Sequence, residues 1–153
     1  MNSLLNTLYR LRRGLWRIYR PRTRGVKVML FDEAGALLLV RHTYGRTDLF
    51  LLPGGGIRPF EQPPAAAVRE VREELGCGVS ALAFVATYQS AAEGKRDTVH
   101  LFTARAEGDI RADGVEVEEA RFFPLDDLPA SVSPATRRRI DEYRGLRERD
   151  GAW

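Results

Sequence analysis

The sequence predicts an α+β fold in which a mixed β-sheet is covered by helices on both faces. Two apolar runs near the start, 26–31 and 36–41, have the composition of paired strands. A segment with two prolines at its start and a glycine after its end, 63–75, has the pattern of a helix. Further strand-like runs follow, and a second helical segment lies near the end of the chain. Elements in this mixed order pack as layers around one sheet.

The chain of 153 residues is long enough for one domain with a sizeable core. We expect a basic amphipathic helix at 1–23 and one folded domain at 24–150. The lone cysteine, Cys77, excludes an internal disulfide and favours a reducing, cytoplasmic location. No apolar run has the length of a membrane span.

The charge of the chain is divided unevenly. Of its 24 basic residues, eight lie in residues 1–27, which contain no acid. The remaining 16 basic and 21 acidic residues give the rest of the chain a net charge of −5, although the whole carries +3. The basic isoelectric point therefore comes from the N-terminal arm, and we expect no DNA binding.

The first residues have the periodicity of a cationic amphipathic helix, which Pro21 ends. Its apolar residues recur at intervals of three and four: Leu4, Leu8, Leu11, Leu15 and Ile18. We expect this helix to span 3–19 and to pack on the domain or on a second subunit, as in a homodimer. Two other roles are peripheral contact with an anionic membrane, which Trp16 and Tyr19 suit, and targeting.

The first half of the domain is expected to begin with a hairpin. The runs 26–31 and 36–41 are separated by Asp-Glu-Ala-Gly, so they should pair antiparallel. After a polar loop, a short buried strand at 49–52 leads into a Pro-Gly-Gly-Gly turn. Glycine lets the backbone of such a turn approach a metal ion or a phosphate closely.

The second half is expected to contain strands at 82–88 and 98–106, on either side of a polar loop at 91–97, and a short strand at 120–124. His42 and His100 are interpreted as ordinary strand residues, because two isolated histidines lack the spacing of metal ligands.

A final helix is expected to begin at Ser133-Pro134, which suit the N-cap and first helical positions, and to extend to about 149. Ile140 and Tyr143 share one face of it. The arginines before Ile140 are expected to face solvent: Arg137, Arg138 and Arg139.

The helix at 63–75 carries three carboxylates on one face. Glu70, Glu73 and Glu74 stand at i, i+3 and i+4, the spacing of neighbours on a helix surface. Like charges at this spacing destabilise an isolated helix by roughly 0.2–0.5 kcal/mol per pair. Arg69 and Arg72 do not neutralise all three, whereas a hard divalent cation held by carboxylates and water would.

The stretch 55–77 resembles the Nudix box without a gap. Gly55 is followed after five residues by Glu61, and after seven more by Arg69-Glu70; Glu73-Glu74 and Gly76 complete the pattern. Seven fixed identities match by chance on the order of 10⁻⁸ per starting position. Cys77 stands where the family usually has an aliphatic residue, and a buried free cysteine behaves as a small hydrophobe.

This resemblance to the Nudix hydrolase family covers roughly 24–145 and implies the Nudix fold, an α/β/α sandwich. It implies that Glu70, Glu73 and Glu74 bind one or more Mg²⁺ or Mn²⁺ ions, with the Gly54 carbonyl as a further metal ligand. It also implies that Arg69 orients Glu73 or Glu74 by ion pairing.

Two more acidic positions follow from the same resemblance. Glu61 is expected to pair within the turn before the helix, as a supporting group. Many members add a metal-binding acid from a later loop, and Glu116 has the best spacing for it. Glu118 and Glu119 stay in contention.

The reaction that the family performs is the attack of water on a phosphorus atom of a diphosphate linked to another group. Metal ions would gather the negative charge of the transition state, and Glu70 or Glu73 is the expected general base. For binding the substrate we expect Arg41, Lys95 and Arg96.

The favoured substrate is a nucleoside diphosphate derivative such as a nucleotide sugar. The nearest rival is removal of pyrophosphate from a nucleoside triphosphate or from the 5′ end of RNA. A non-catalytic, nucleotide-sensing Nudix module is the alternative from another class, and the intact carboxylates oppose it. An enzyme acting on a lipid-linked diphosphate would be consistent with the amphipathic arm.

Overall fold

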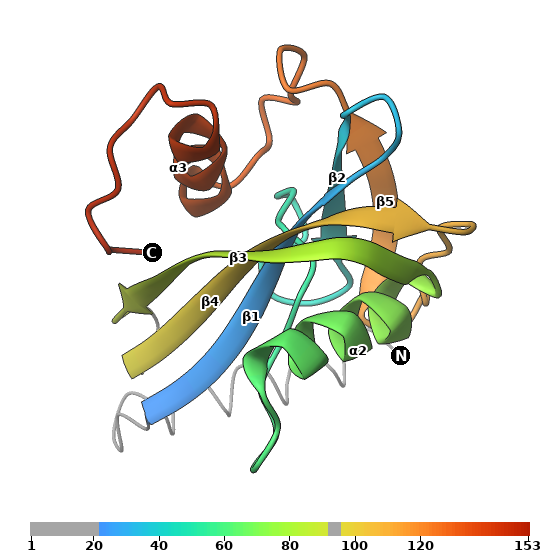
Figure 1. Ribbon diagram of the computed structural model, residues 1–153. Helices are drawn as coiled ribbons and strands as arrows, with labels where there is room; N and C mark the ends of the chain where they lie inside the picture. The colour runs from blue at the N-terminus through green and yellow to red at the C-terminus, as the bar shows by residue number, and fades with distance from the viewer. Residues whose placement is uncertain (1–21, 92–95) are drawn as a thin grey trace.

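The computed structural model describes residues 22–91 and 96–153 (Figure 1). The predicted N-terminal helix at 3–19 and the predicted substrate-binding residue Lys95 lie outside the described residues. Neither of the two described helices has the length and apolar composition needed to cross a membrane.

One five-stranded mixed sheet organises the described chain. Its strands are β1 (Arg22–Phe31), β2 (Leu37–His42), β3 (Gly78–Ser90), β4 (Arg96–Glu107) and β5 (Val117–Phe123), and its helices are α2 (Pro63–Leu75) and α3 (Pro134–Tyr143). The strand order is β3-β4-β1-β2-β5. β1 and β4 run parallel, and the other neighbours are antiparallel. The predicted α+β fold with a mixed sheet is confirmed.

The two helices cover opposite faces of the sheet, because alternate strand residues point to opposite sides. Figure 1 shows α2 on one side of the strands and α3 on the other. The core under α2 joins side chains of β1 and β2 to the helix: Val26, Val28, Leu38, Val40, Ala67, Val71 and Leu75. The core under α3 uses the intervening strand positions: Met29, Leu37, Leu39, Leu101 and Ile140.

The segment between β2 and α2 fills a gap in the sheet. β1 and β2 are paired next to their turn, at Phe31 and Leu37. Farther along, the intervening segment bonds to β1, where the Val26 N–H donates to the Gly55 carbonyl at 2.9 Å. The glycine turn is therefore held between strands, at the end of the sheet from which α2 begins.

The strand predicted at 49–52 is wrong, because this segment forms only isolated bridges. Leu51 exchanges two hydrogen bonds of 2.9 Å with Val40 of β2, and Phe50 bridges to Val132 in the parallel sense. The neighbouring residues switch partner from one bridge to the next, so no continuous ladder forms.

The other elements follow the predicted order. α2 has the predicted bounds, and Gly76 ends it in the left-handed conformation (φ 67°), its N–H bonded to the Arg72 carbonyl. β3 and β4 are longer than predicted because their pairing continues from Gly78 to Ser90, through two irregularities. Ser133 caps α3 as predicted. α3 ends at Tyr143, before the predicted limit of about 149, and Gly145 then takes a positive φ of 73°.

The prediction that Arg139 faces solvent is wrong. Its side chain is 0% exposed and bonds to Glu142 at 2.7 Å, while its guanidinium lies 4.0 Å from the centre of the Tyr88 ring. The Tyr88 hydroxyl donates to the same Glu142 carboxylate at 2.6 Å. Trp153 packs edge-on against Tyr88 and closes the cluster. Contacts with the end of the chain thus bury Arg139, which would be exposed on the helix alone.

We predict that Glu142→Ala destabilises the protein by about 3–5 kcal/mol, because it leaves the buried Arg139 without its carboxylate. The free energy of unfolding in urea measures this effect. Arg147→Ala is the matched control, since its pair with Asp150 is about half exposed and contributes at most about 1 kcal/mol. Equal stability losses in the two variants would contradict the assignment.

Candidate active site

A four-residue turn leads into α2. The Glu61 N–H donates to the Arg58 carbonyl at 3.1 Å, and the Glu61 carboxylate accepts the Arg58 N–H at 2.9 Å. The backbone N–H groups of Arg58 and Glu61 therefore both have hydrogen-bond partners within the turn. The predicted pairing of Glu61 within this turn is present in the structure.

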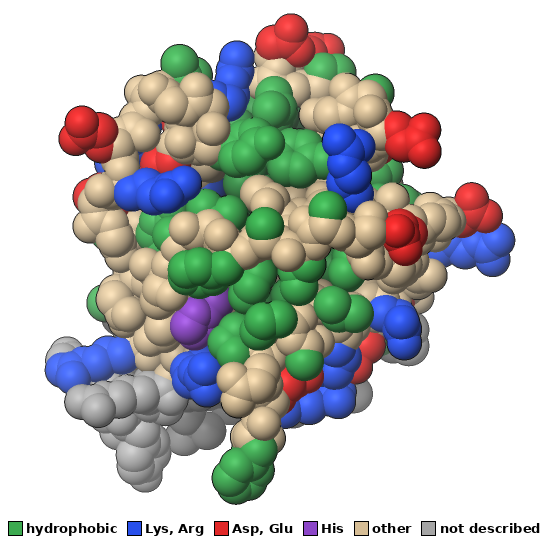
Figure 2. All heavy atoms as spheres, in the orientation of Figure 1, with side chains coloured by type: hydrophobic (Ala, Val, Ile, Leu, Met, Phe, Trp, Pro, Cys, Tyr) green, Lys and Arg blue, Asp and Glu red, His purple; other side chains and the backbone are tan. Residues whose placement is uncertain are grey.

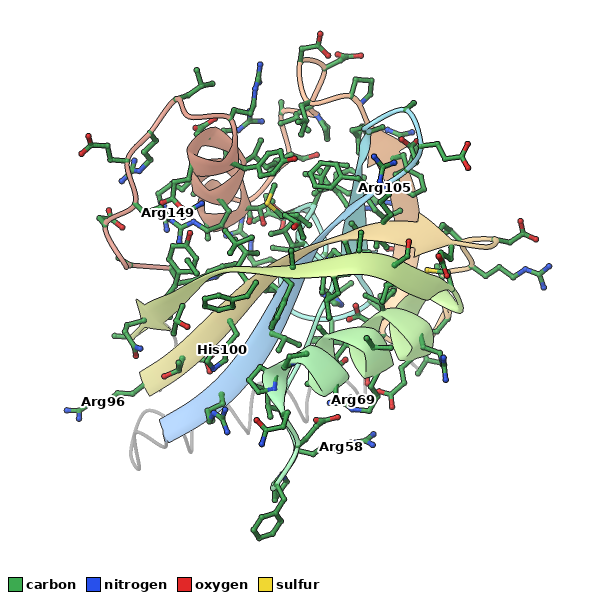
Figure 3. The ribbon with its side chains drawn as sticks, in the orientation of Figure 1. Arg58, Arg69, Arg96, His100, Arg105 and Arg149 are labelled. Carbon is green, nitrogen blue, oxygen red and sulfur yellow. The ribbon has the colours of Figure 1, made fainter. Side chains whose placement is uncertain are left out.

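Arg69 joins this turn to the helix. Its Nε and Nη2 donate to the two oxygens of Glu61 at 2.7 and 2.8 Å, and Nη2 also donates to the Gly56 carbonyl at 2.8 Å. Its Nη1 donates to Glu70 at 2.7 Å and to Glu73 at 3.0 Å. Figure 3 shows Arg69 on α2 and Arg58 on the segment that precedes the helix. The pairing with Glu73 agrees with the expected role of Arg69; the bonds to Glu61 and Glu70 extend that role.

The three box carboxylates occupy different surroundings. Glu74 is 3% exposed, and its Oε2 accepts the Gly54 N–H at 2.9 Å. Glu70 is buried beside the Gly55 backbone, where an added Cβ would lie 2.6 Å from its carboxylate. The Glu73 side chain is 49% exposed and bonds to Arg58 at 3.0 Å as well as to Arg69. The glycine turn therefore contacts the two buried carboxylates directly.

The pKa of Glu74 is raised to about 7, mainly by burial and to a smaller extent by the neighbouring charges of Glu70 and Glu116. The Lys27 ammonium and the Gly54 N–H act in the opposite direction. Glu61 is the contrasting case, because hydrogen bonds from Arg69 lower its pKa to about 2. Negative charge is thus crowded at the buried end of the carboxylate face and well compensated at the turn.

Lys27 is a site residue that the sequence analysis did not single out. Its Nζ donates to the Leu52 carbonyl at 2.9 Å and lies 3.4 Å from the Gly54 carbonyl, the predicted metal ligand. It places a positive charge beside the crowded carboxylates. A lone charge inside the apolar run 26–31 was the available sequence signal.

His42 was predicted to be an ordinary strand residue, but its side chain also lies at this site. Its Nδ1 is 3.1 Å from the Glu116 carbonyl. Burial and the charge of Lys27 lower its pKa to about 4, so the ring is neutral near pH 7. His100, on β4, bonds to Thr87 and matches the original interpretation.

Among the acids of the later loop, Glu116 is near enough to Glu74 to affect its pKa. Glu119 instead pairs with Arg41 at 2.6 Å. Arg41 also lies over Phe50, on the sheet face that α3 covers. Arg96 is exposed at the start of β4, apart from Arg69 in Figure 3. The structure therefore does not gather Arg41 and Arg96 around the carboxylates.

The donor atoms at the site suit Mg²⁺ or Mn²⁺, which prefer carboxylate and carbonyl oxygens. The raised pKa of Glu74 favours a bound cation, because a cation would offset the cost of burying its charge beside Glu70 and Glu116. Within 22–91 and 96–153, however, no three acidic, histidine or cysteine side chains are close enough to share one ion. The predicted convergence of the box carboxylates would require Glu73 to leave Arg58 and Arg69.

Glu74 predicts a pH dependence of stability in the metal-free protein. Its pKa rises from 4.5 to about 7 on folding, so its stabilising contribution is complete below 4.5 and is lost as the pH rises through about 7. The loss is on the order of 3 kcal/mol. Unfolding in urea with a chelator present measures it, and Glu74→Gln should remove this part of the pH dependence. An unchanged pH profile in the variant would refute the prediction.

Comparisons with known proteins agree with the box. A family model described as the NUDIX domain matches residues 21–143. A protein of Bacillus subtilis (strain 168), named as a candidate 8-oxo-dGTP diphosphatase, is 32% identical over 123 residues, 80% of this chain and 80% of that protein. The NAD-capped RNA hydrolase NudC of Shigella flexneri is 31% identical over 127 residues, 81% of this chain but 49% of that protein.

A solved structure shows the same architecture. The MutT NUDIX hydrolase from Burkholderia pseudomallei superposes with a TM-score of 0.71 at 26% sequence identity, over 78% of this chain and 96% of that chain. The family match includes every described strand and helix, and it includes the box with its intact carboxylates. This chain therefore belongs to the Nudix family of pyrophosphohydrolases.

Proposed function

We propose that the protein hydrolyses the diphosphate linkage of a nucleoside diphosphate derivative, such as a nucleotide sugar, with Mg²⁺ or Mn²⁺. The observation that carries this proposal is the buried Glu74 carboxylate, which accepts the Gly54 N–H and has Glu70 and Glu116 near it; burial first, and these two charges second, raise its pKa to about 7. Such a site favours a divalent cation, and a diphosphate group needs one to offset its own charge.

The residues divide the work as follows. Glu70, Glu73 and Glu74 would hold the metal together with Glu116 and the Gly54 carbonyl. The bound metal would supply charge neutralisation and a more acidic water. The exposed Glu73 or the buried Glu70 accepts the proton of the attacking water. Arg69 holds both of these carboxylates, at 3.0 and 2.7 Å, and thereby sets their orientation.

A second substrate class has support from one relative. The Bacillus subtilis protein is named for 8-oxo-dGTP, a nucleoside triphosphate. Removal of pyrophosphate from a nucleoside triphosphate or from the 5′ end of RNA is therefore the rival function, whereas NudC, named for NAD-capped RNA, fits the first class because NAD joins two nucleosides through a diphosphate. A sensing role without catalysis is disfavoured, because the box carboxylates are intact.

A substrate panel distinguishes these functions. Release of nucleoside monophosphate, pyrophosphate and phosphate is measured for nucleotide sugars, nucleoside triphosphates and 5′-triphosphorylated RNA, with Mg²⁺ or Mn²⁺ or with a chelator. We expect metal-dependent cleavage of nucleotide sugars, and a loss of at least ~10²-fold in Glu73→Gln and Glu74→Gln. Faster cleavage of triphosphates would select the rival, and wild-type rates in either variant would remove that residue from the mechanism.

The contact between Gly55 and Glu70 gives a separate prediction. Gly55→Ala places a methyl group 2.6 Å from the Glu70 carboxylate and must displace it. Because misplacing a catalytic group by about 1 Å costs up to about 10²-fold, we expect a large fall in kcat with little change in the melting temperature. Gly56→Ala is the matched control, since an added Cβ there meets nothing within 4 Å. Similar rates in the two variants would show that this contact does not position Glu70.

A further inference from the structure

The turn before α2 presents an aromatic ring to solvent. Pro59 and Phe60 are its two central residues, and the Glu61 N–H closes it on the Arg58 carbonyl. Phe60 has a φ of 64°, in the left-handed region. Proline second and a positive φ third are typical of a type II turn, whose third residue is usually glycine.

Phe60 makes no packing contact with the described chain that would offset the strain of this conformation. Its exposed fraction is 103%, so the ring rests on no part of the described chain. A bulky side chain at positive φ is strained, and glycine would relieve the strain at no loss of packing. Strain of this kind at an exposed position points to a role in binding.

The support of the ring is rigid. Glu61 accepts the Arg58 N–H and two hydrogen bonds from Arg69, and the side chains of Glu61 and Arg69 are only 15% and 16% exposed. The turn is thus fixed to α2, and Phe60 is carried at a constant position relative to the helix. The backbone that carries the ring therefore loses little conformational entropy when the ring binds.

Two further arginines are exposed at the same end of the molecule, at the starts of β1 and β4. The Ile57 N–H donates to the Arg24 carbonyl at 2.9 Å, and β1 begins beside Arg96 of β4. Arg24 and Arg96 are exposed, and Arg58 is exposed but paired with Glu73 at 3.0 Å. Figure 2 shows basic side chains along this edge, where β1 and β4 begin, with acidic side chains among them beside α2.

We propose that this end of the protein docks on an anionic lipid bilayer, with the Phe60 ring in the interface and Arg24 and Arg96 on the headgroups. Aromatic rings combined with basic side chains are the composition of interfacial anchors. Single-stranded nucleic acid is the less suitable partner, because it stacks on successive aromatic platforms along a groove, whereas Phe60 is one fully exposed ring on a four-residue turn. This surface is independent of the proposed substrate.

A fluorophore at position 60 tests the proposal directly. Phe60→Cys in the full chain is labelled with the environment-sensitive dye NBD; Cys77 is 3% exposed and does not compete. We expect a blue shift and stronger emission with vesicles of equal parts phosphatidylcholine and phosphatidylglycerol, and no change with phosphatidylcholine alone. Leu146→Cys, labelled at another exposed apolar position beyond α3, should not respond.

Phe60→Gly separates binding from folding. We expect its affinity for the mixed vesicles to fall about tenfold, equivalent to about 1.4 kcal/mol, while the melting temperature stays equal or rises because the strain is removed. Three results would overturn the proposal: a full chain that does not bind the vesicles, an unchanged affinity in Phe60→Gly, or a dye that responds to single-stranded RNA and not to vesicles.

Discussion

The structure of the site depends on the guanidinium of Arg69. Its five hydrogen bonds reach Glu61, the Gly56 carbonyl, Glu70 and Glu73, so one planar group connects the turn, the glycine segment and two box carboxylates. Lysine has neither the planar geometry nor the number of fixed donors for this arrangement. The same bonds that build the turn also determine where the carboxylates lie. Structural and chemical roles of the box are therefore inseparable at this residue.

A second constraint is the gap between β1 and β2, into which the glycine segment fits. Gly54 has a φ of 137°, and an added Cβ would collide with the Val26 carbonyl, so close packing on β1 requires glycine there. The close approach lets the Gly54 N–H reach Glu74 while its carbonyl lies near Lys27. One residue, Gly54, thus joins the buried Glu74 carboxylate to the half-buried Lys27 ammonium through its N–H and its carbonyl. The result is a site in which a negative charge is costly until a further cation binds.

The sequence predicted best what is determined locally. The bounds of α2 followed from prolines, a terminal glycine and the helical period, all of which act within a few residues. Contacts between distant segments were less accessible. Arg139 is buried by Trp153 and Tyr88, which are distant in sequence. The segment 49–52, expected as a strand, instead forms single bridges with β2 and with the segment before α3. The box predicted a set of metal-binding carboxylates, but it did not reveal that Arg58 and Arg69 both pair with Glu73.

At Phe60, local turn geometry and contacts between distant segments act together. Its left-handed conformation persists because the hydrogen bonds of Glu61 and Arg69 define the turn more strongly than one strained residue opposes it. The rigidity that orients the carboxylates therefore also makes an exposed, strained aromatic residue tolerable. A bilayer bound through Phe60 would be held at a nearly fixed position relative to α2. It would therefore set the direction from which a substrate approaches the carboxylates. Docking and catalysis would then share one rigid support.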